Sequence, residues 1–313
     1  MTRSATRRPW RRWLVLVLLL VAFGAGAFGV AMWRAPLATT ALVGRLSLRA
    51  AGFSPATAPS SGGPVAYLAA GSGPLLAFLH GANDQGSTWA RIAPAFVDRY
   101  RVVVADLAGH GQSAPANGPL ALADLVAGVE AVVAAERSGA PSILVGNSLG
   151  GFLALIHALD HPGEVALVVS VNGGVVRGGD TEVAGLLLPR TRDEARRAVD
   201  ALLSPRSARV PDFVLDDLVR RAPTSPLARL MTGPASAADA WGIDDRLGGL
   251  HTPVALIWGA DDRLMPLAYA EQSRAALPDA TLDVIPECGH VPQRECPARL
   301  IAPLEAALAR VGR

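Results

Sequence analysis

One serine in this chain of 313 residues lies in a pattern that suits a nucleophile. Ser148 stands in the run Gly-Asn-Ser-Leu-Gly-Gly, with Gly146 two residues before it and Gly150 two residues after it. An apolar, largely β-branched segment precedes this run and an apolar helical segment follows it, so we expect a strand to turn abruptly into a helix at the serine. Glycines at these two positions leave room for the strand and the helix to cross at a strained turn. A glycine-rich turn with an ordinary serine is the alternative until partners for Ser148 are found.

The elements around Ser148 alternate between strands and helices. Strands are predicted at 65–68, 75–79, 101–105, 142–145, 165–171, 254–258 and 281–285, and helices at 88–96, 120–136, 149–159, 269–277 and 297–311. This alternation implies an α/β fold with a mostly parallel sheet and helices on both faces. Residues 173–240 break the alternation with charged helical sequence and several prolines. We expect this segment to form an inserted helical cap over the carboxyl edge of the sheet.

A serine nucleophile needs a base within hydrogen-bond distance, and that base needs an acid that orients it. On this architecture the acid and the histidine follow the serine in chain order, at the carboxyl ends of late strands. The loop after strand 254–258 contains Asp261 and Asp262, and the bare sequence does not separate these two aspartates. His290 is the only one of six histidines that lies beyond this loop. The predicted catalytic residues are therefore Ser148, one of the two aspartates and His290.

Two backbone amides are expected to stabilise the negative charge that forms on an attacked carbonyl oxygen. The amide of Leu149 directly follows the serine and lies at a helix N-terminus, where the helix dipole also favours negative charge. The amide of Ala82 lies in the loop after strand 75–79 and is the second expected donor. In contrast, we expect His80 and Asp106 to hold loops in place by hydrogen bonds and to transfer no protons.

Assembled in order, these segments resemble the α/β-hydrolase-fold serine hydrolases over roughly residues 65–313. The resemblance rests on His80-Gly81, Asp-Leu-Ala-Gly-His-Gly-Gln-Ser at 106–113, the run around Ser148, Trp-Gly-Ala-Asp-Asp at 258–262 and Gly289-His290. In that family the acid usually lies three residues after the glycine of the Trp-Gly pair, which selects Asp262. A serine nucleophile argues against the haloalkane dehalogenase and epoxide hydrolase branches, because these use an aspartate at that position.

Within the family, the run His-Gly-Ala-Asn-Asp at 80–84 is similar to the branch of membrane-anchored monoacylglycerol lipases and bacterial lipases and esterases. This resemblance implies cleavage of carboxylic esters, with lipophilic, acylglycerol-like esters as the expected substrates, through an acyl-enzyme and with neither a cofactor nor a metal. The Gly-Asn-Ser-Leu-Gly-Gly run also occurs in hydrolases that cleave carbon–carbon bonds, so such a hydrolase, or a perhydrolase with the same triad, is one alternative. A catalytically silent, membrane-tethered binding protein is another, and the complete triad argues against it.

The N-terminal residues have the pattern of a membrane anchor. Five arginines and no acidic residue precede an uncharged apolar run at 13–33, which has a tryptophan at each end. Such a run is long enough to cross a hydrocarbon layer of ~30 Å as a helix, and the arginines favour a cytoplasmic N-terminus. We therefore expect a cytoplasmic basic segment at 1–12, a transmembrane signal-anchor at 13–33, a juxtamembrane linker at 34–64, which begins with a short helix, and an extracytoplasmic hydrolase domain at 65–313. Secretion after cleavage of a signal peptide is the alternative.

The charge of the remaining chain excludes one class of partner. Of 29 basic residues, all arginines, five precede the apolar run, which leaves 24 against 27 acidic residues and a formal charge of −3. A basic excess of the kind that binds nucleic acid is therefore absent from the sequence of the predicted domain. The expected partners are a small ester or lipid substrate and, through the apolar run, a membrane.

Cys288 and Cys296 are the two cysteines of the chain, and they bracket His290. A disulfide between them is possible if the domain is exported to an oxidising compartment. Two separate, partly buried thiols are the alternative, because the sequence does not give the distance between the two Cα atoms.

Overall fold

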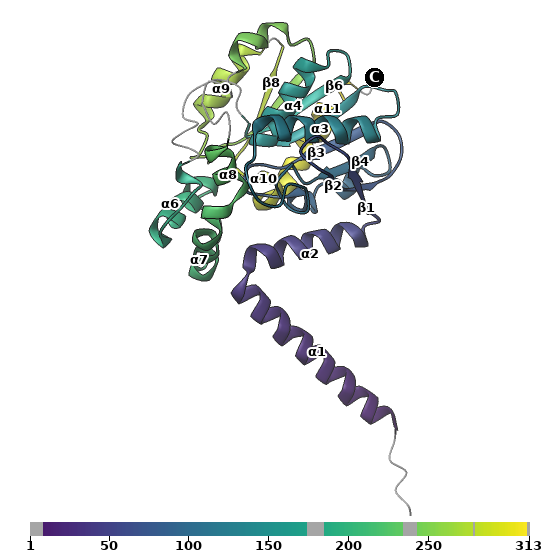
Figure 1. The fold of residues 1–313 in the computed structure, drawn as a ribbon, viewed down its shortest axis with the longest axis vertical. Helices are drawn as coiled ribbons and strands as arrows, with labels where there is room; N and C mark the ends of the chain where they lie inside the picture. The colour runs from purple at the N-terminus through teal and green to yellow at the C-terminus, as the bar shows by residue number, and fades with distance from the viewer. Residues whose placement is uncertain (1–8, 174–184, 234–242, 278, 312–313) are drawn as a thin grey trace, which may run out of the picture.

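The centre of the molecule is an eight-stranded sheet with the strand order β1-β2-β4-β3-β5-β6-β7-β8 (Figure 1). The structure is a computed structural model, and it describes residues 9–173, 185–233, 243–277 and 279–311. β2 is antiparallel to both of its neighbours, and the other neighbouring pairs are parallel. The strands are β1 Ser54–Ala58, β2 Val65–Ala70, β3 Leu75–Leu79, β4 Arg101–Ala105, β5 Ser142–Asn147, β6 Val165–Val171, β7 Val254–Gly259 and β8 Thr281–Ile285. All seven predicted strands are confirmed, with ends that differ by at most two residues.

Two apolar layers sandwich this sheet, because side chains along each strand point alternately to its two faces. In β3, Ala77 and Leu79 join one layer, while Leu76 and Phe78 join the other. The first layer is covered by α3 Leu122–Glu136 and α4 Leu149–Asp160, and the second by α11 Pro297–Leu308 and two short 3₁₀ helices. Helix α9 Leu267–Ala276 packs against β7 and β8. The predicted α/β fold, with helices on both faces of a mostly parallel sheet, is confirmed.

The structure corrects two sequence-based expectations. Residues 54–58 form the edge strand β1, which pairs with β2, whereas the whole stretch from 53 to 64 was expected to be linker. Serine, proline and alanine are weak strand formers, and the proline of β1 is tolerated because an edge strand has unpaired backbone groups on one side. The expected helix at 88–96 consists of two 3₁₀ helices, η1 Gly86–Trp89 and η2 Ala93–Phe96, and the second begins at a proline turn.

Within residues 185–233, which the structure describes, the segment expected to form the cap consists mainly of helices joined by short loops. It contains α6 Arg192–Leu202, α7 Asp212–Arg221, the short η3 Ala222–Thr224 and α8 Pro226–Thr232. Ala195 and Val199 of α6 and Leu215 of α7 form a small apolar core between these two helices. Residues 174–184 and 234–240 of the expected cap lie outside the described residues. The chain then returns to the sheet through η5 Asp244–Gly249.

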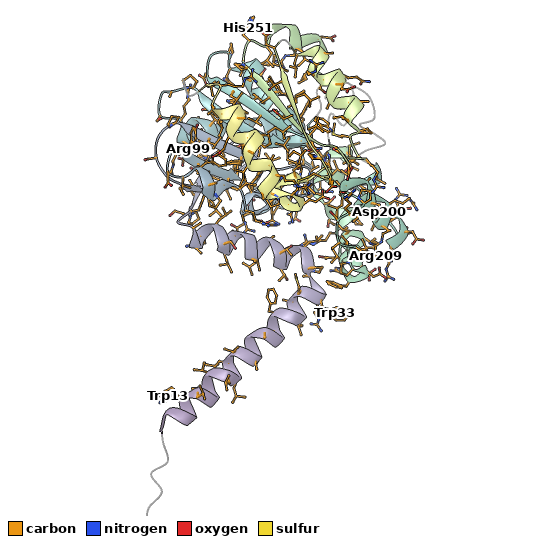
Figure 2. All side chains as sticks on the ribbon, turned by 180° about the vertical axis from the view of Figure 1, so that it is seen from behind. Trp13, Trp33, Arg99, Asp200, Arg209 and His251 are labelled. Atoms are coloured by element: carbon orange, nitrogen blue, oxygen red, sulfur yellow. A yellow bond between two sulfur atoms is a disulfide. The ribbon has the colours of Figure 1, made fainter. Side chains whose placement is uncertain are left out.

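The N-terminal helix α1 Pro9–Arg34 projects from the rest of the molecule as an isolated arm (Figure 1). Its stretch Leu16–Arg34 has a mean hydropathy of 2.2 and is not buried against the protein. Figure 2 shows Trp13 and Trp33 near the two ends of this apolar stretch. By length and composition α1 can cross a membrane, and a signal sequence near the N-terminus has the same properties.

Cap helix α7 fixes the corner at which α1 meets helix α2 Pro36–Ala50. The amide of Leu37, in the first turn of α2, donates a hydrogen bond of 3.1 Å to the Asp217 carboxylate, whose side chain is 1% exposed. The Arg220 guanidinium, which pairs with this carboxylate, also donates to the carbonyl of Arg34 at 2.8 Å. A carboxylate at the start of one helix and a guanidinium at the end of another are the charges that the two helix dipoles favour. The cap is therefore attached to the point at which α1 leaves the domain.

Candidate active site

Ser148 occupies the turn between the central strand β5 and helix α4, as the sequence predicts. Its backbone has φ 51° and ψ −117°, a conformation that a non-glycine residue adopts only under strain. The amide of Ser148 donates to the carbonyl of Val171 at 2.9 Å, which attaches the turn to strand β6. A Cβ atom on Gly150 would lie 2.5 Å from the carbonyl oxygen of Leu79, so a side chain there would collide with strand β3. The glycines therefore permit a close crossing that holds the serine at the carboxyl edge of the sheet.

Asp262 and His290 form a buried hydrogen-bonded pair at the same edge. The Nδ1 atom of His290 lies 2.7 Å from Oδ2 of Asp262, and each residue is 3% exposed. The other carboxylate oxygen, Oδ1, accepts hydrogen bonds from the amides of Leu264 at 3.0 Å and Met265 at 2.8 Å. A carboxylate that accepts a hydrogen bond from Nδ1–H keeps the proton on Nδ1 and leaves the lone pair of the imidazole on Nε2, the atom that acts as base in a triad.

Asp261, the other aspartate that the sequence left open, has a different environment. Its carboxylate pairs with the hydroxyl of Ser204, which follows cap helix α6, and its amide donates to the carbonyl of Cys288 at 2.9 Å. Asp261 thus connects the acid loop to the cap and to the segment that leads to His290. Asp262 is the aspartate that contacts the histidine, in agreement with the choice that the resemblance implied.

Asn172 supports the acid and was not predicted from the sequence. Its side-chain amide donates to Oδ2 of Asp262 at 2.6 Å, the same oxygen that faces His290. Its own Oδ1 accepts the amide of Gly259 at 3.3 Å, and its backbone has φ 50°, in the left-handed region that asparagine tolerates. The signal available in the sequence was its position, directly after a buried parallel strand, where open α/β sheets place functional side chains.

Asn147 connects the serine turn to the histidine loop, and this role was also missed. Its side-chain amide donates to the carbonyls of Val171 and His290, both at 3.0 Å. Its Oδ1 accepts a hydrogen bond of 3.0 Å from the side chain of Gln293, which is fully buried. The residue next to Ser148 is therefore bonded to the backbone of His290, so the two predicted residues belong to one rigid assembly.

The loop after β3, which carries Ala82, lies against the serine. A Cβ atom on Gly81 would be 3.3 Å from the Cβ of Ser148, which shows how closely this loop approaches the nucleophile. His80 fixes the start of the loop. Its Nε2 accepts a hydrogen bond of 2.9 Å from the amide of Leu107, and its Nδ1 lies 2.7 Å from the carbonyl oxygen of Gly81. Burial lowers the pKa of His80, so the neutral ring holds these two bonds. The expected bracing role of His80 is confirmed.

Asp106 braces the glycine-rich loop after β4, also as expected. Its carboxylate accepts hydrogen bonds from the backbone amides of Gly86 at 2.7 Å and Gln112 at 2.9 Å. Arg45 of helix α2 lies 3.3 Å from the same carboxylate, so α2 is connected to the loops that surround the site.

The loop that carries His290 is closed by a disulfide between Cys288 and Cys296, whose Cα atoms are 6.2 Å apart. The alternative of two separate thiols is therefore wrong for this structure. A bond between residues eight positions apart restricts the unfolded chain, and for a loop of this length the entropic stabilisation is about 2–3 kcal/mol.

We expect the purified chain to contain this bridge and to depend on it for stability. Alkylation without a reductant should modify no cysteine, and alkylation after reduction should modify two, as read from the intact mass. The double variant C288S/C296S should lose about 2–3 kcal/mol of unfolding free energy. Two alkylatable thiols in the unreduced protein would contradict the bridge.

Comparisons with known proteins agree with this fold. The profile of the Alpha/beta hydrolase family matches residues 76–303. A bacterial membrane phospholipase A of known structure is 26% identical, with a TM-score of 0.70, and the match covers 96% of this chain and 99% of that protein. Among curated proteins, the dihydrolipoyllysine-residue acetyltransferase component of the acetoin cleaving system of Cupriavidus necator is 32% identical over 241 residues. That alignment covers 74% of this chain but 63% of the relative, so the chain spans less than two thirds of its length.

A second kind of relative catalyses a different reaction. The 2-hydroxy-6-oxononadienedioate/2-hydroxy-6-oxononatrienedioate hydrolase of a Pseudomonas species is 28% identical over 240 residues, which cover 71% of this chain and 83% of that protein. The matched fold thus includes both ester and carbon–carbon hydrolases.

Proposed function

Because the chain belongs to the alpha/beta hydrolase family, we propose that it is a serine hydrolase that cleaves carboxylic esters through an acyl-enzyme on Ser148. One observation carries the proposal. The hydrogen-bonded pair of Asp262 and His290 is held by Asn147 next to the strained turn that presents this serine. A base with an orienting acid beside a half-buried turn serine is the arrangement that nucleophilic catalysis requires.

In the proposed reaction, Oγ of Ser148 attacks the ester carbonyl carbon while Nε2 of His290 takes the hydroxyl proton. The amides of Leu149 and Ala82 stabilise the negative charge on the tetrahedral intermediate, and Asp262 stabilises the imidazolium. The C–O bond to the leaving group then breaks, and His290 returns the proton to the departing alcohol. Water, deprotonated by the same histidine, then attacks the acyl carbon. The bond from this carbon to Oγ of Ser148 breaks, His290 returns the proton to Oγ, and the carboxylic acid is released. Each hydrogen-bond donor to the oxyanion is worth about 10²–10³ in rate in enzymes of this kind.

Lipophilic esters such as acylglycerols or phospholipids are the proposed substrates. Two observations support this choice. The likeness to a membrane phospholipase A extends over 96% of the chain, which includes most of the N-terminal helices. In addition, α7 of the cap is bonded to the end of α1, and α6, α7 and α2 lie on the side of the domain from which α1 leaves (Figure 1). If α1 lies in a bilayer, the cap is adjacent to its surface, where such substrates are concentrated.

We further propose that α1 anchors the protein and that the hydrolase domain lies outside the cytoplasm. The disulfide beside His290 supports this location, because disulfides persist in oxidising compartments and are rare in the cytosol.

The proposal is tested with the full-length chain in detergent micelles. A fluorophosphonate probe should label the wild type on Ser148, as identified by peptide mass, and should not label S148A. The wild type should hydrolyse p-nitrophenyl esters of increasing acyl length and phospholipids in mixed micelles, and S148A should not. Turnover by S148A would contradict the mechanism, and a wild type that neither reacts with the probe nor cleaves esters would favour a silent binding protein.

Carbon–carbon bond hydrolysis is the second candidate, favoured by the likeness to the Pseudomonas hydrolase. The same triad serves both reactions, so the site alone does not separate them. Cleavage of a 2-hydroxy-6-oxo-dienoate without cleavage of any ester in the panel would establish carbon–carbon bond hydrolysis as the function.

A further inference from the structure

The loop that carries Ala82 is bonded directly to the cap through one side chain, that of Asn83. Oδ1 of Asn83 accepts a hydrogen bond of 3.0 Å from the amide of Leu227, in the first turn of cap helix α8. Its Nδ2 donates to the carbonyl of Leu187, at 3.4 Å, in a separate segment of the cap. Asn83 therefore bridges two parts of the cap from a position next to the proposed oxyanion donor.

The backbone of this loop is a tight turn in which Asn83 has a special conformation. The amide of Asp84 donates to the carbonyl of Gly81 at 3.3 Å, so residues 81–84 form one turn. Asn83 is the third residue of the turn and has φ 57°, which glycine and asparagine adopt at low cost. In the part of the chain that the structure describes, the amide of Ala82, the second residue of the turn, has no acceptor, which leaves it available to an oxyanion.

Both ends of the turn are fixed to the body of the domain. His80 is bonded to Leu107 at one end. At the other end the Asp84 carboxylate forms an ion pair with Arg294, which lies four residues after His290 in the short helix α10 Pro292–Glu295. Burial alone would raise the pKa of Asp84, but the charge and hydrogen bond of Arg294, together with His80 and the amide of Gln85, lower this pKa below its usual value, so the carboxylate is ionised. With its ends held, the turn is attached to the described part of the cap through one side chain, that of Asn83.

We propose that Asn83 is a positioning residue that couples the cap to the oxyanion site: its bond to Leu227 sets the direction of the Ala82 amide. This inference rests on the proposed function. When α8 is in place, the side chain of Asn83 is held in a single orientation, and the adjoining peptide is held with it. Without that bond both ends of the turn stay fixed, but the backbone at residues 82 and 83 becomes more mobile. The amide is then misaligned in a fraction of the molecules, and the stabilisation of the oxyanion falls.

The variant N83G separates this role from folding. Glycine keeps the positive φ without strain and removes only the side chain that reaches the cap. We expect kcat for a short p-nitrophenyl ester to fall about 10-fold and KM to stay within about twofold, because the lost interaction acts in the transition state. The rate constant for labelling by the fluorophosphonate should fall by a similar factor, since the phosphonyl oxygen occupies the same site.

Ser225 provides the matched control. Its hydroxyl accepts the amide of Ala228 at 3.3 Å and caps the same end of α8, but it has no bond to the loop of Ala82. S225A should lower the melting temperature at least as much as N83G, and it should leave kcat within about twofold of the wild type. The full chain is used throughout, and thermal unfolding reports whether each variant is folded.

The outcomes distinguish the two levels of the proposal. An unchanged kcat in N83G, or an equal fall in S225A, overturns the coupling and leaves the serine mechanism intact. A wild type that cleaves no ester and is not labelled at Ser148 overturns the proposed function, and the coupling with it. A change confined to KM would mean that Asn83 contacts the substrate and does not position the amide.

Discussion

Replacing Asp262 with asparagine is expected to lower kcat by about 10³–10⁴ with little change in KM. Each oxygen of this carboxylate accepts from donors: Oδ2 from His290 and from the amide of Asn172, and Oδ1 from the amides of Leu264 and Met265. An asparagine has one acceptor oxygen, so its NH₂ group must face either His290 or two backbone N–H groups. In the first case the imidazole takes the wrong tautomer, and a serine protease with the corresponding change loses about 10⁴ in kcat.

The neighbouring aspartate offers a control of the same chemistry. D261N removes a carboxylate one residue away that contacts Ser204 and not the histidine. We expect its kcat to stay within about threefold of the wild type, measured on the same ester and with the same detergent. A loss in D261N as large as that in D262N, or a D262N variant that retains more than about a tenth of the wild-type kcat, would contradict the assigned role of Asp262.

The pair of aspartates also shows how far the sequence can predict the site. Chain order singled out His290, and the strand–glycine–serine–helix pattern located Ser148, because both signals depend on local sequence and strand order. Asp261 and Asp262 could not be separated in this way, since their difference lies in which residue faces the histidine loop. That direction is set by contacts with residues 28 and 57 positions away, His290 and Ser204, which no local pattern contains.

The supporting asparagines were missed for a related reason. Asn147 is the last residue of β5 and Asn172 directly follows the neighbouring β6, and their roles arise from hydrogen bonds to segments far away in the sequence. In the fold, the strands with continuous apolar runs were predicted well, because burial on both faces demands such runs. The edge strand β1 has only Ala58 buried and therefore needs no apolar run, and its Ser-Pro-Ala-Thr-Ala sequence gave a turn-like signal.

The glycine before the serine should be among the least replaceable residues of the chain. In β5, Gly146 pairs with β3 and β6, and a Cβ atom there would overlap the backbone of Gly150 and Gly151 where α4 begins. Neither partner can retreat, because β5 is a central strand and α4 is packed on the sheet. We expect G146A to lose at least about 4 kcal/mol of unfolding free energy, which for a domain of this size lowers the melting temperature by about 10 °C.

The same substitution at Gly248, in η5, is the control, because no atom lies within 4 Å of the Cβ position there. G248A should change the unfolding free energy by no more than about 0.5 kcal/mol. Both variants are compared by thermal unfolding and by fluorophosphonate labelling below their melting temperatures. If G146A has the same melting temperature as G248A, the strand and the helix can separate at the turn. The close crossing is then not what holds Ser148 in its strained conformation. If G146A is folded at low temperature but is not labelled, the glycine is needed chiefly to present the nucleophile. If G146A is destabilised and is still labelled, the crossing serves the fold more than the chemistry.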